Sequence, residues 1–349
     1  MTELDRFRIL VCVGTGGVGK TTIAAALAYQ AARRGRRSLV LTIDPARALA
    51  RALGLAALGE PVQIVPDVPF SAAMLDQKQA WDAFITRHAP SETVARSLLA
   101  NPFYQRLSTS FAGSTEYMAV EEMCRQAESG RYDLIVLDTP PSAHALDFVS
   151  APGRIDQLFD RRLAQWFAGG AWRTAGAAAR YLFRKLEAAT GAATLRDIAA
   201  FFVALDALVD ATLERTRRVR ALLRGGDAGF VLVAAPRQLA MEETGELFDK
   251  LAAQPTPLAS VVINRVHSLP QVEGLAEQLA SFGDDAAGRW LRAAWTDATA
   301  EVEDERAVID RFRATLPQGI RVRAVPEAAH DLHALADLAH VVEALSDPE

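Results

Sequence analysis

The sequence predicts an α/β fold with a mostly parallel sheet flanked by helices and an inserted α-helical subdomain. Short apolar runs alternate with segments of strong helix formers, which is typical of a parallel sheet covered on both faces. The first run ends in a glycine-rich loop with a phosphate-binding pattern. Two long helical stretches, about 77–129 and 154–223, interrupt the alternation. We interpret 1–349 as one domain, with these stretches as the insertions that form the subdomain.

The first element is a strand over Phe7 to Val13, an apolar run that ends in glycines. A helix follows Lys20, because the next fourteen residues are good helix formers and Gly35 closes them. A second strand runs from Ser38 to Ile43. Together these elements form a βαβ unit with the glycine-rich loop in its first turn.

The later strands are expected over Phe70 to Met74 and Asp133 to Leu137, each a short apolar run. The intervening helical region has a break at Asn101-Pro102. Further strands are expected over 230–233, 260–263 and 321–324, each followed by helix, with the last helix over 331–345.

Composition points to an ordinary globular protein. The 349 residues are 50% hydrophobic and 23% charged, and the formal net charge of −5 gives no reason to expect nucleic acid binding. The N-terminus has no secretory signal pattern, and no apolar run reaches the ~18 residues of a spanning helix. We therefore expect a cytoplasmic protein. Cys12 and Cys124 are too few for a four-ligand zinc site, so no zinc is expected.

The loop Gly14-Thr15-Gly16-Gly17-Val18-Gly19-Lys20-Thr21 satisfies G-x-x-x-x-G-K-[ST]. Glycines allow successive backbone N–H groups to point at phosphate oxygens, and the following helix directs its positive end at the same anion. Lys20 places a cation at the β- and γ-phosphates, and the Thr21 hydroxyl can ligate magnesium. The glycines also fit the dinucleotide pattern G-x-G-x-x-G, but the Lys20-Thr21 pair favours a triphosphate. The sequence thus predicts a P-loop NTPase that binds ATP and Mg²⁺.

Two aspartates follow predicted strands. Asp138 ends an apolar run, where a carboxylate points into the ligand crevice of a parallel sheet and can hold magnesium. Asp44 ends the second strand and could orient a water for attack on the γ-phosphate. Either aspartate could instead cap the following helix.

Taken together, the loop with its double threonine Thr21-Thr22, the segment Asp44-Pro45-Ala46 and the segment Asp138-Thr139-Pro140-Pro141 resemble the ArsA/Get family of anion-transporting and protein-targeting ATPases. The likeness runs nearly from end to end of the chain. The first of the two aspartate segments resembles the family's first switch, which continues at Arg47. The second resembles its second switch, which extends to His144.

The resemblance implies an ATP-dependent dimer, a homodimer or a heterodimer with a paralogous ATPase, that closes around nucleotide. It implies that Asp44 positions the attacking water and that Lys20 acts on the phosphates. Asn264 looks like the residue that reads adenine, and Pro326 belongs to the late loop that stacks on the base. The switches would relay nucleotide state to the helical subdomain, which in the family faces a hydrophobic client or a membrane protein.

Three departures from the family pattern matter. Thr15 stands where the family has a signature lysine that reaches the partner's nucleotide, so hydrolysis should be slow. Arg47-Ala48 replaces the usual His-Ser of the first switch. The chain also lacks the C-x-x-C of a dimer-clasping zinc and the cysteine trio for arsenite. Arsenite extrusion is therefore disfavoured.

The leading hypothesis is a magnesium-dependent ATPase switch. The alternative is a slow or inactive ATP-binding subunit that works with a paralogue, and a third possibility is a kinase or ligase on a similar fold. Aromatic and arginine residues crowd the helices at 160–202. They form either a groove for a hydrophobic partner or the core of the subdomain, and the sequence leaves both open.

Overall fold

The computed structural model describes residues 6–43, 48–59, 62–65, 67–110, 114–140, 192–254, 256–269, 274–282, 285–330 and 332–346. Among these residues, eight strands form one sheet in the order β3-β4-β2-β5-β1-β6-β7-β8. The strands are β1 (Ile9–Gly14), β2 (Ser38–Thr42), β3 (Val62–Val65), β4 (Val68–Met74), β5 (Leu134–Asp138), β6 (Ala228–Ala234), β7 (Leu258–Val266) and β8 (Val322–Pro326).

The sheet is mostly parallel, as the sequence predicts. Strands β2, β5, β1, β6, β7 and β8 pair in parallel along this order, while β3 pairs antiparallel with β4. The central strands read as unbroken apolar runs because both faces of the sheet are covered. The fold is therefore an α/β fold of the P-loop type with helices on the sheet.

The register of the central strands decides where the polar residues meet. Asp138, the last residue of β5, lies opposite Cys12 of β1 and opposite Thr42 of β2. Because parallel strands end at one edge, the carboxyl end of β5 lies beside the loop that follows β1.

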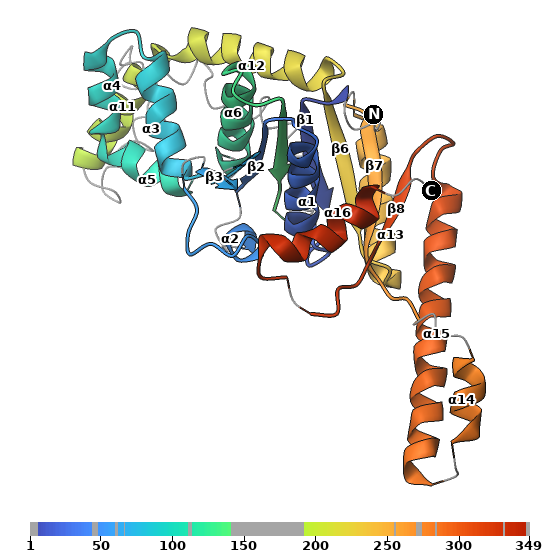
Figure 1. Cartoon of the computed structure of the whole chain (residues 1–349). Coiled ribbons are helices and arrows are strands. Elements are labelled where there is room, and N and C mark those ends of the chain that lie inside the picture. The colour runs from blue at the N-terminus through green and yellow to red at the C-terminus, as the bar shows by residue number, and fades with distance from the viewer. Residues whose placement is uncertain are drawn as a thin grey trace, which may run out of the picture. The chain divides into compact units, whose positions relative to one another are not determined.

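The contacts divide the chain into two compact units. The first, the sheet unit, comprises residues 1–73, 132–145 and 228–349, and the second, the helical unit, comprises 74–131 and 146–227. Helices of the sheet unit are α1 (Lys20–Arg33), α2 (Ala48–Ala52), α13 (Gln238–Ala252), α14 (Leu275–Ser281), α15 (Ala286–Thr315) and α16 (Leu338–Ser346). Figure 1 shows α1 beside α16 and the short α14 alongside the thirty-residue α15.

The described helices of the helical unit are α3 (Gln77–His88), α4 (Glu92–Leu99), α5 (Pro102–Ser110), α6 (Ser114–Glu128), α11 (Ala192–Asp206) and α12 (Val209–Arg224). The predicted break at Asn101-Pro102 is confirmed. It separates α4 from α5, and the Asn101 side chain accepts from the backbone N–H groups of Phe103 and Tyr104. Asn101 therefore caps the start of α5.

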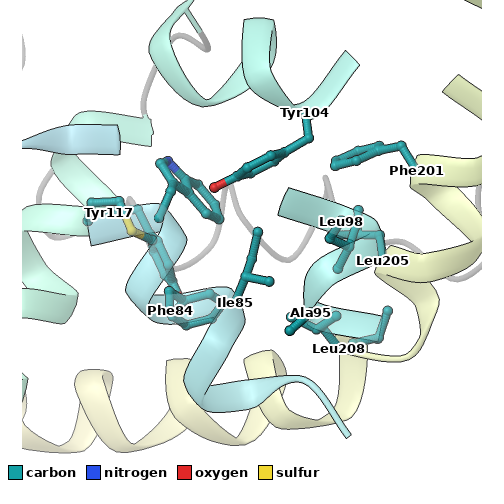
Figure 2. Packing of buried hydrophobic residues seen from close by; sticks show 12 residues of the cluster. Phe84, Ile85, Ala95, Leu98, Tyr104, Tyr117, Phe201, Leu205 and Leu208 are labelled. Carbon is teal, nitrogen blue, oxygen red and sulfur yellow. The ribbon is translucent and has the colours of Figure 1, made fainter. Parts of the chain in front are cut away.

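Aromatic and aliphatic side chains form the core of the helical unit (Figure 2). Phe84 and Tyr117 are fully buried, and Trp81 packs edge-on against Phe84. Phe201 of α11 is buried there too, stacked with Tyr104. This aromatic residue at the end of the crowded 160–202 segment is thus core. The aromatic residues of this segment that precede residue 192, including Trp166 and Trp172, lie outside the described residues.

A strand and the start of the last helix are among the features that differ from the sequence prediction. Strand β3 was not predicted, because Val62–Val65 is a short edge strand with too few residues to show a pattern. The last helix begins at Leu338 and not at 331, because the preceding residues form a single 3₁₀ turn, Leu335–Asp337, whose Asp337 carboxylate accepts from the N–H groups of His333 and Ala334. Within the described residues, no helix combines the length and apolarity needed to cross a membrane.

Candidate functional site

A cleft of about 570 Å³ opens at the carboxyl edge of the sheet, within the sheet unit. The loop after β1 and the start of α1 form one wall, with Gly17, Gly19, Lys20, Thr21 and Thr22. Further lining residues come from the ends of β7 and β8 and the segments that follow them, including Asn264, Arg265, Pro326, Glu327 and His330. The sequence-predicted loop and the two late residues therefore share one cleft.

Two loop glycines are required by their surroundings. A side chain at Gly14 would collide with the backbone carbonyl of Val233 on the neighbouring strand β6. Gly19 has φ +87°, and a side chain there would collide with the Asn264 amide. Only glycine allows both the left-handed backbone and the close approach, so the loop holds the curved path that exposes its N–H groups.

Lys20, the first residue of α1, is only 7% exposed. Its ammonium donates to the carbonyl oxygens of Gly14 (3.1 Å) and Thr15 (2.8 Å), which hold the side chain across its own loop. The residue before the helix is glycine, and no side chain caps the first turn. The N-terminus of α1 thus has the free N–H donors and positive dipole that attract an anion.

Thr21 and Asp138 meet although they are far apart in sequence. The Thr21 hydroxyl donates to Asp138 Oδ2 at 2.8 Å, and the Thr42 hydroxyl donates to the same oxygen at 2.9 Å. Asp138 is 1% exposed. A hydroxyl next to a buried carboxylate, beside a phosphate-type loop, is an all-oxygen donor set that suits Mg²⁺. The residues present therefore fit the ion that the sequence predicts.

Asn264 and Pro326 line the cleft from the ends of β7 and β8. The Asn264 side-chain amide donates to the carbonyl of Val18 at 2.9 Å and is 5% exposed. This bond joins the end of β7 to the loop after β1. Next to it, Arg265 lines the cleft with φ +61°, a conformation that non-glycine residues rarely adopt.

Among the residues of this region that sequence reasoning missed are Thr42, Arg51 and Arg265. Thr42 is the last residue of β2, and Arg51 of α2 lines the cleft. A threonine inside an apolar run and an arginine on a short helix carry no motif. Only the strand register and the packing of α2 bring these side chains to the site.

Several predicted switch residues lie outside the described residues: Asp44, Pro45, Ala46 and Arg47 of the first switch, and Pro141 and His144 of the second. Thr139 is described. It is buried and donates to the carbonyl of Cys12 at 2.7 Å, which fastens the start of the segment predicted as the second switch to β1. Pro140 follows it, half-buried.

Thr15 is 2% exposed, and its hydroxyl has no hydrogen-bond partner among the described residues. The side chain is thus packed within the fold. Cys12 lies behind the loop, where burial, and next the Asp138 charge, raise the pKa of its thiol well above the usual value. A thiol with so high a pKa is unreactive, as expected for a structural cysteine.

Comparisons with known proteins agree with this geometry. The chain is similar to an ATPase GET3 of Malassezia globosa (30% identity over 152 residues, 44% of each chain). It is also similar to an ATPase GET3 of Phaeosphaeria nodorum (26% over 309 residues, 85% of this chain and 86% of the relative). A third relative is an ATPase ARSA2 of Chlamydomonas reinhardtii (29% over 266 residues, 72% and 66%).

The first of these matches spans less than half of the relative's length, whereas the second spans most of it. A family model described as anion-transporting ATPase matches residues 7–276. That range includes the phosphate loop, Asp138 and Asn264. The chain therefore belongs to the ArsA family of anion-transporting ATPases.

Proposed function

We propose that this protein is a magnesium-dependent ATPase that uses ATP binding and hydrolysis as a conformational switch. The observation that carries the proposal is the contact between Thr21 and Asp138 at the edge of a phosphate-type loop. A hydroxyl and a carboxylate together beside such a loop are the groups that commonly hold the metal of a bound nucleotide, which supports the proposal.

The arrangement supports a division of labour. The N–H groups of the loop and of α1 would hold the phosphates, and Lys20 would exchange its two carbonyl partners for phosphate oxygens. Thr21 and Asp138 would hold Mg²⁺, which neutralises charge that develops on the phosphates. Asn264 and Pro326, which also line the cleft, would contact the base. Asp44 would orient the attacking water.

The assignment of Asp44 is tested by Asp44→Asn. We expect ATP binding, measured by calorimetry with Mg²⁺, to stay within about twofold of wild type. Turnover should fall about 10²–10⁴-fold, the usual contribution of a positioned base. Asp67→Asn, at an exposed position of the same unit, is the matched control. An Asp44→Asn protein that hydrolyses ATP at the wild-type rate would remove this role. Products other than ADP and free phosphate would favour a kinase or ligase.

A second function has an observation in its favour: an ATP-binding subunit with slow or no turnover. Thr15 is short, uncharged and packed within the fold, so it cannot place a cation at a second nucleotide. In the family such a cation stabilises the developing negative charge, and its loss lowers the rate. A paralogue that carries the lysine would then supply the missing charge.

Comparison of wild type with Thr15→Lys separates the two functions. Thr15→Met, which has similar length and no charge, controls for disturbed packing at a buried position. A gain in turnover with lysine alone supports the slow subunit. A brisk wild-type rate that lysine does not improve supports the self-sufficient enzyme.

We also propose that the active form is a dimer, of two copies or with a paralogue, and that it binds a hydrophobic client or membrane partner. The relatives named GET3 and the family membership support this assignment. Light scattering of the purified chain with and without ATP and Mg²⁺ tests it. A mass that stays monomeric with nucleotide, in the presence of the candidate paralogue too, would contradict the dimer.

A further inference from the structure

An imidazole and two carboxylates converge where β7 ends against α15. Glu301 and Glu305 lie one turn apart on α15, so their side chains share a face of the helix. His267 directly follows β7. The ligand atoms of these three residues all lie within 4.8 Å of one another. None of the three is part of the phosphate end of the cleft.

Two of the three donors are held in place. Glu305 is 8% exposed, and its Oε2 accepts from the backbone N–H of His267 at 2.9 Å. Its other oxygen, Oε1, lies 2.7 Å from His267 Nδ1. On the far side of the ring, His267 Nε2 lies 2.5 Å from Glu327 Oε2. The imidazole is therefore fixed with Nδ1 towards Glu305 and Nε2 towards a carboxylate.

A histidine that binds a metal through one nitrogen commonly donates its other N–H to a carboxylate, which fixes the tautomer and strengthens the ligand. Glu327 occupies that place. Zinc lies about 2.0–2.2 Å from nitrogen and carboxylate ligands, so tetrahedral ligand atoms are roughly 3.3–3.5 Å apart. The separations from Nδ1 are 2.7 Å to Glu305 and 3.9 Å to Glu301, on either side of that value.

The third donor, the carboxylate of Glu301, is free to adjust. The Glu301 side chain is 64% exposed, whereas that of Glu305 is 10% exposed. A small rotation of Glu301 would bring its oxygen into the sphere, and the open side leaves room for a water as fourth ligand. The site is thus half preformed and half accessible from solvent.

We propose that His267, Glu301 and Glu305 bind a divalent first-row transition ion of the zinc class, with Glu327 supporting the imidazole. An imidazole ligand favours Zn²⁺ or Co²⁺ over Mg²⁺ and Ca²⁺, which prefer oxygen donors alone. The absence of a cysteine set argues only against a thiolate zinc site and does not bear on this donor set. The bound ion would tie α15 to the end of β7.

This site also touches the nucleotide cleft through one residue, because Glu327 lines the cleft as well as holding His267. The bound metal would therefore fix the side chain of a cleft residue. Zinc binding itself does not depend on nucleotide, so it can be tested whether or not the protein hydrolyses ATP.

The competing arrangement is a plain ion pair, in which a protonated His267 bridges Glu305 and Glu327 with no metal. Glu301→Gln distinguishes the two. Glu301 is exposed and 3.9 Å from the ring, so its charge is dispensable to the ion pair. In the metal site it is a ligand. Glu303→Gln, exposed on the same helix and outside the cluster, is the matched control.

The experiment is a titration of the tag-free, chelator-treated full chain with Zn²⁺ by calorimetry, and with Co²⁺ by visible absorption. We expect one site in wild type and in Glu303→Gln, an affinity at least about tenfold weaker in Glu301→Gln, and loss of the site in His267→Gln. Glu327→Gln should weaken binding by about 10–100-fold, as other changes to a supporting carboxylate do. Circular dichroism without metal checks that each variant is folded.

Two results would overturn the proposal. One is a wild-type chain that binds no Zn²⁺ more tightly than His267→Gln, which would leave the ion pair as the whole explanation. The other is Zn²⁺ affinity that is equal in wild type and Glu301→Gln, which would place the ion at other histidines, of which the chain has five more.

Discussion

The buried charges of the two units are held in different ways. In the sheet unit, Lys20 donates to two backbone carbonyls and Asp138 accepts from two hydroxyls. In the helical unit, Arg215 of α12 is bonded to two carboxylates, Glu121 and Glu128 of α6, each at 2.6 Å. Burial raises the pKa of Glu121, while Arg215 opposes that rise. Arg215 is thus paired with opposite charges, whereas the hydrogen bonds described above join Lys20 and Asp138 to uncharged groups.

The difference separates charges that stabilise the fold from charges that can bind a ligand. A buried ion pair closed on itself has nothing left to offer a ligand, and removing one partner strands the other. Charges held by carbonyls and hydroxyls at a cleft can exchange these weak partners for a phosphate or a metal. Substitutions in the sheet unit should therefore change binding, and substitutions at Arg215 should change stability.

The largest expected effect is that of Lys20→Ala on nucleotide affinity. Loss of the cation from a desolvated phosphate contact costs about 2–5 kcal/mol, roughly 30-fold to several-thousandfold in Kd. The free energy of unfolding without nucleotide should change much less, because the acceptors of the Lys20 ammonium in the loop, the carbonyls of Gly14 and Thr15, are neutral. Calorimetric titration with ATP and Mg²⁺, together with urea unfolding, measures both. An ATP affinity that Lys20→Ala leaves unchanged would contradict the role of this charge in ligand binding.

Arg215→Ala should act in the opposite way. It leaves Glu121, 4% exposed, without its main partner and should lower the free energy of unfolding by about 3–5 kcal/mol. ATP affinity of the folded protein should be unchanged. Glu128→Gln is the control, because that carboxylate is half exposed and should cost under about 1 kcal/mol. The double variant Arg215→Met, Glu121→Met should recover most of the stability that Arg215→Ala loses. Urea unfolding of wild type and of the three variants tests this.

Asp138→Asn tests the metal end of the site. Asparagine can still accept from Thr21 and Thr42, so the fold should be kept, but the negative charge offered to Mg²⁺ is gone. We expect the gain in ATP affinity on adding Mg²⁺ to shrink by about 1–3 kcal/mol. Titrations with and without Mg²⁺ give that difference directly. An undiminished gain would show that Asp138 does not serve the metal.

The smallest effect is expected at an exposed ion pair. Arg37 donates to Asp133 from its side chain and its backbone, and this holds the pKa of Asp133 at about 2, below the usual value. The folded-state pKa is lowered, so the pair stabilises the protein above about pH 4 and loses that effect as the pH falls towards 2. Asp133→Asn should lower stability at pH 7 by under about 1 kcal/mol. The difference from wild type should vanish near pH 2, as followed by unfolding at several pH values.

The sheet was predictable because its central strands are buried on both faces and appear as continuous apolar runs. Strand β3 was missed for the opposite reason, since a four-residue edge strand has no such run. The extent of α15 was missed as well. Few of its thirty residues are buried, and Trp290 near its start is 68% exposed, so its sequence shows no continuous buried stripe.

The phosphate loop could be found from sequence because its residues are adjacent along the chain. The contact of Thr21 with Asp138 depends on the order of the strands in the sheet. A carboxylate at the end of an apolar run suggests a place at the edge of the sheet, but it does not give that order. The cluster of His267 with Glu305 could not be found, because 38 residues separate them and a helix must first be placed against a strand end. Only the spacing of Glu301 and Glu305 was visible, and that spacing is common on surface helices.

The hold of Lys20 on its own loop has a consequence for how fast the site fills. Without nucleotide, the ammonium is already hydrogen-bonded to the carbonyls of Gly14 and Thr15 at the start of the loop. The loop is therefore preformed and does not have to fold around the nucleotide. Nucleotide binding should therefore be limited by collision and not by ordering of the loop, and the loop should keep nearly the same backbone conformation in the empty and the nucleotide-bound protein.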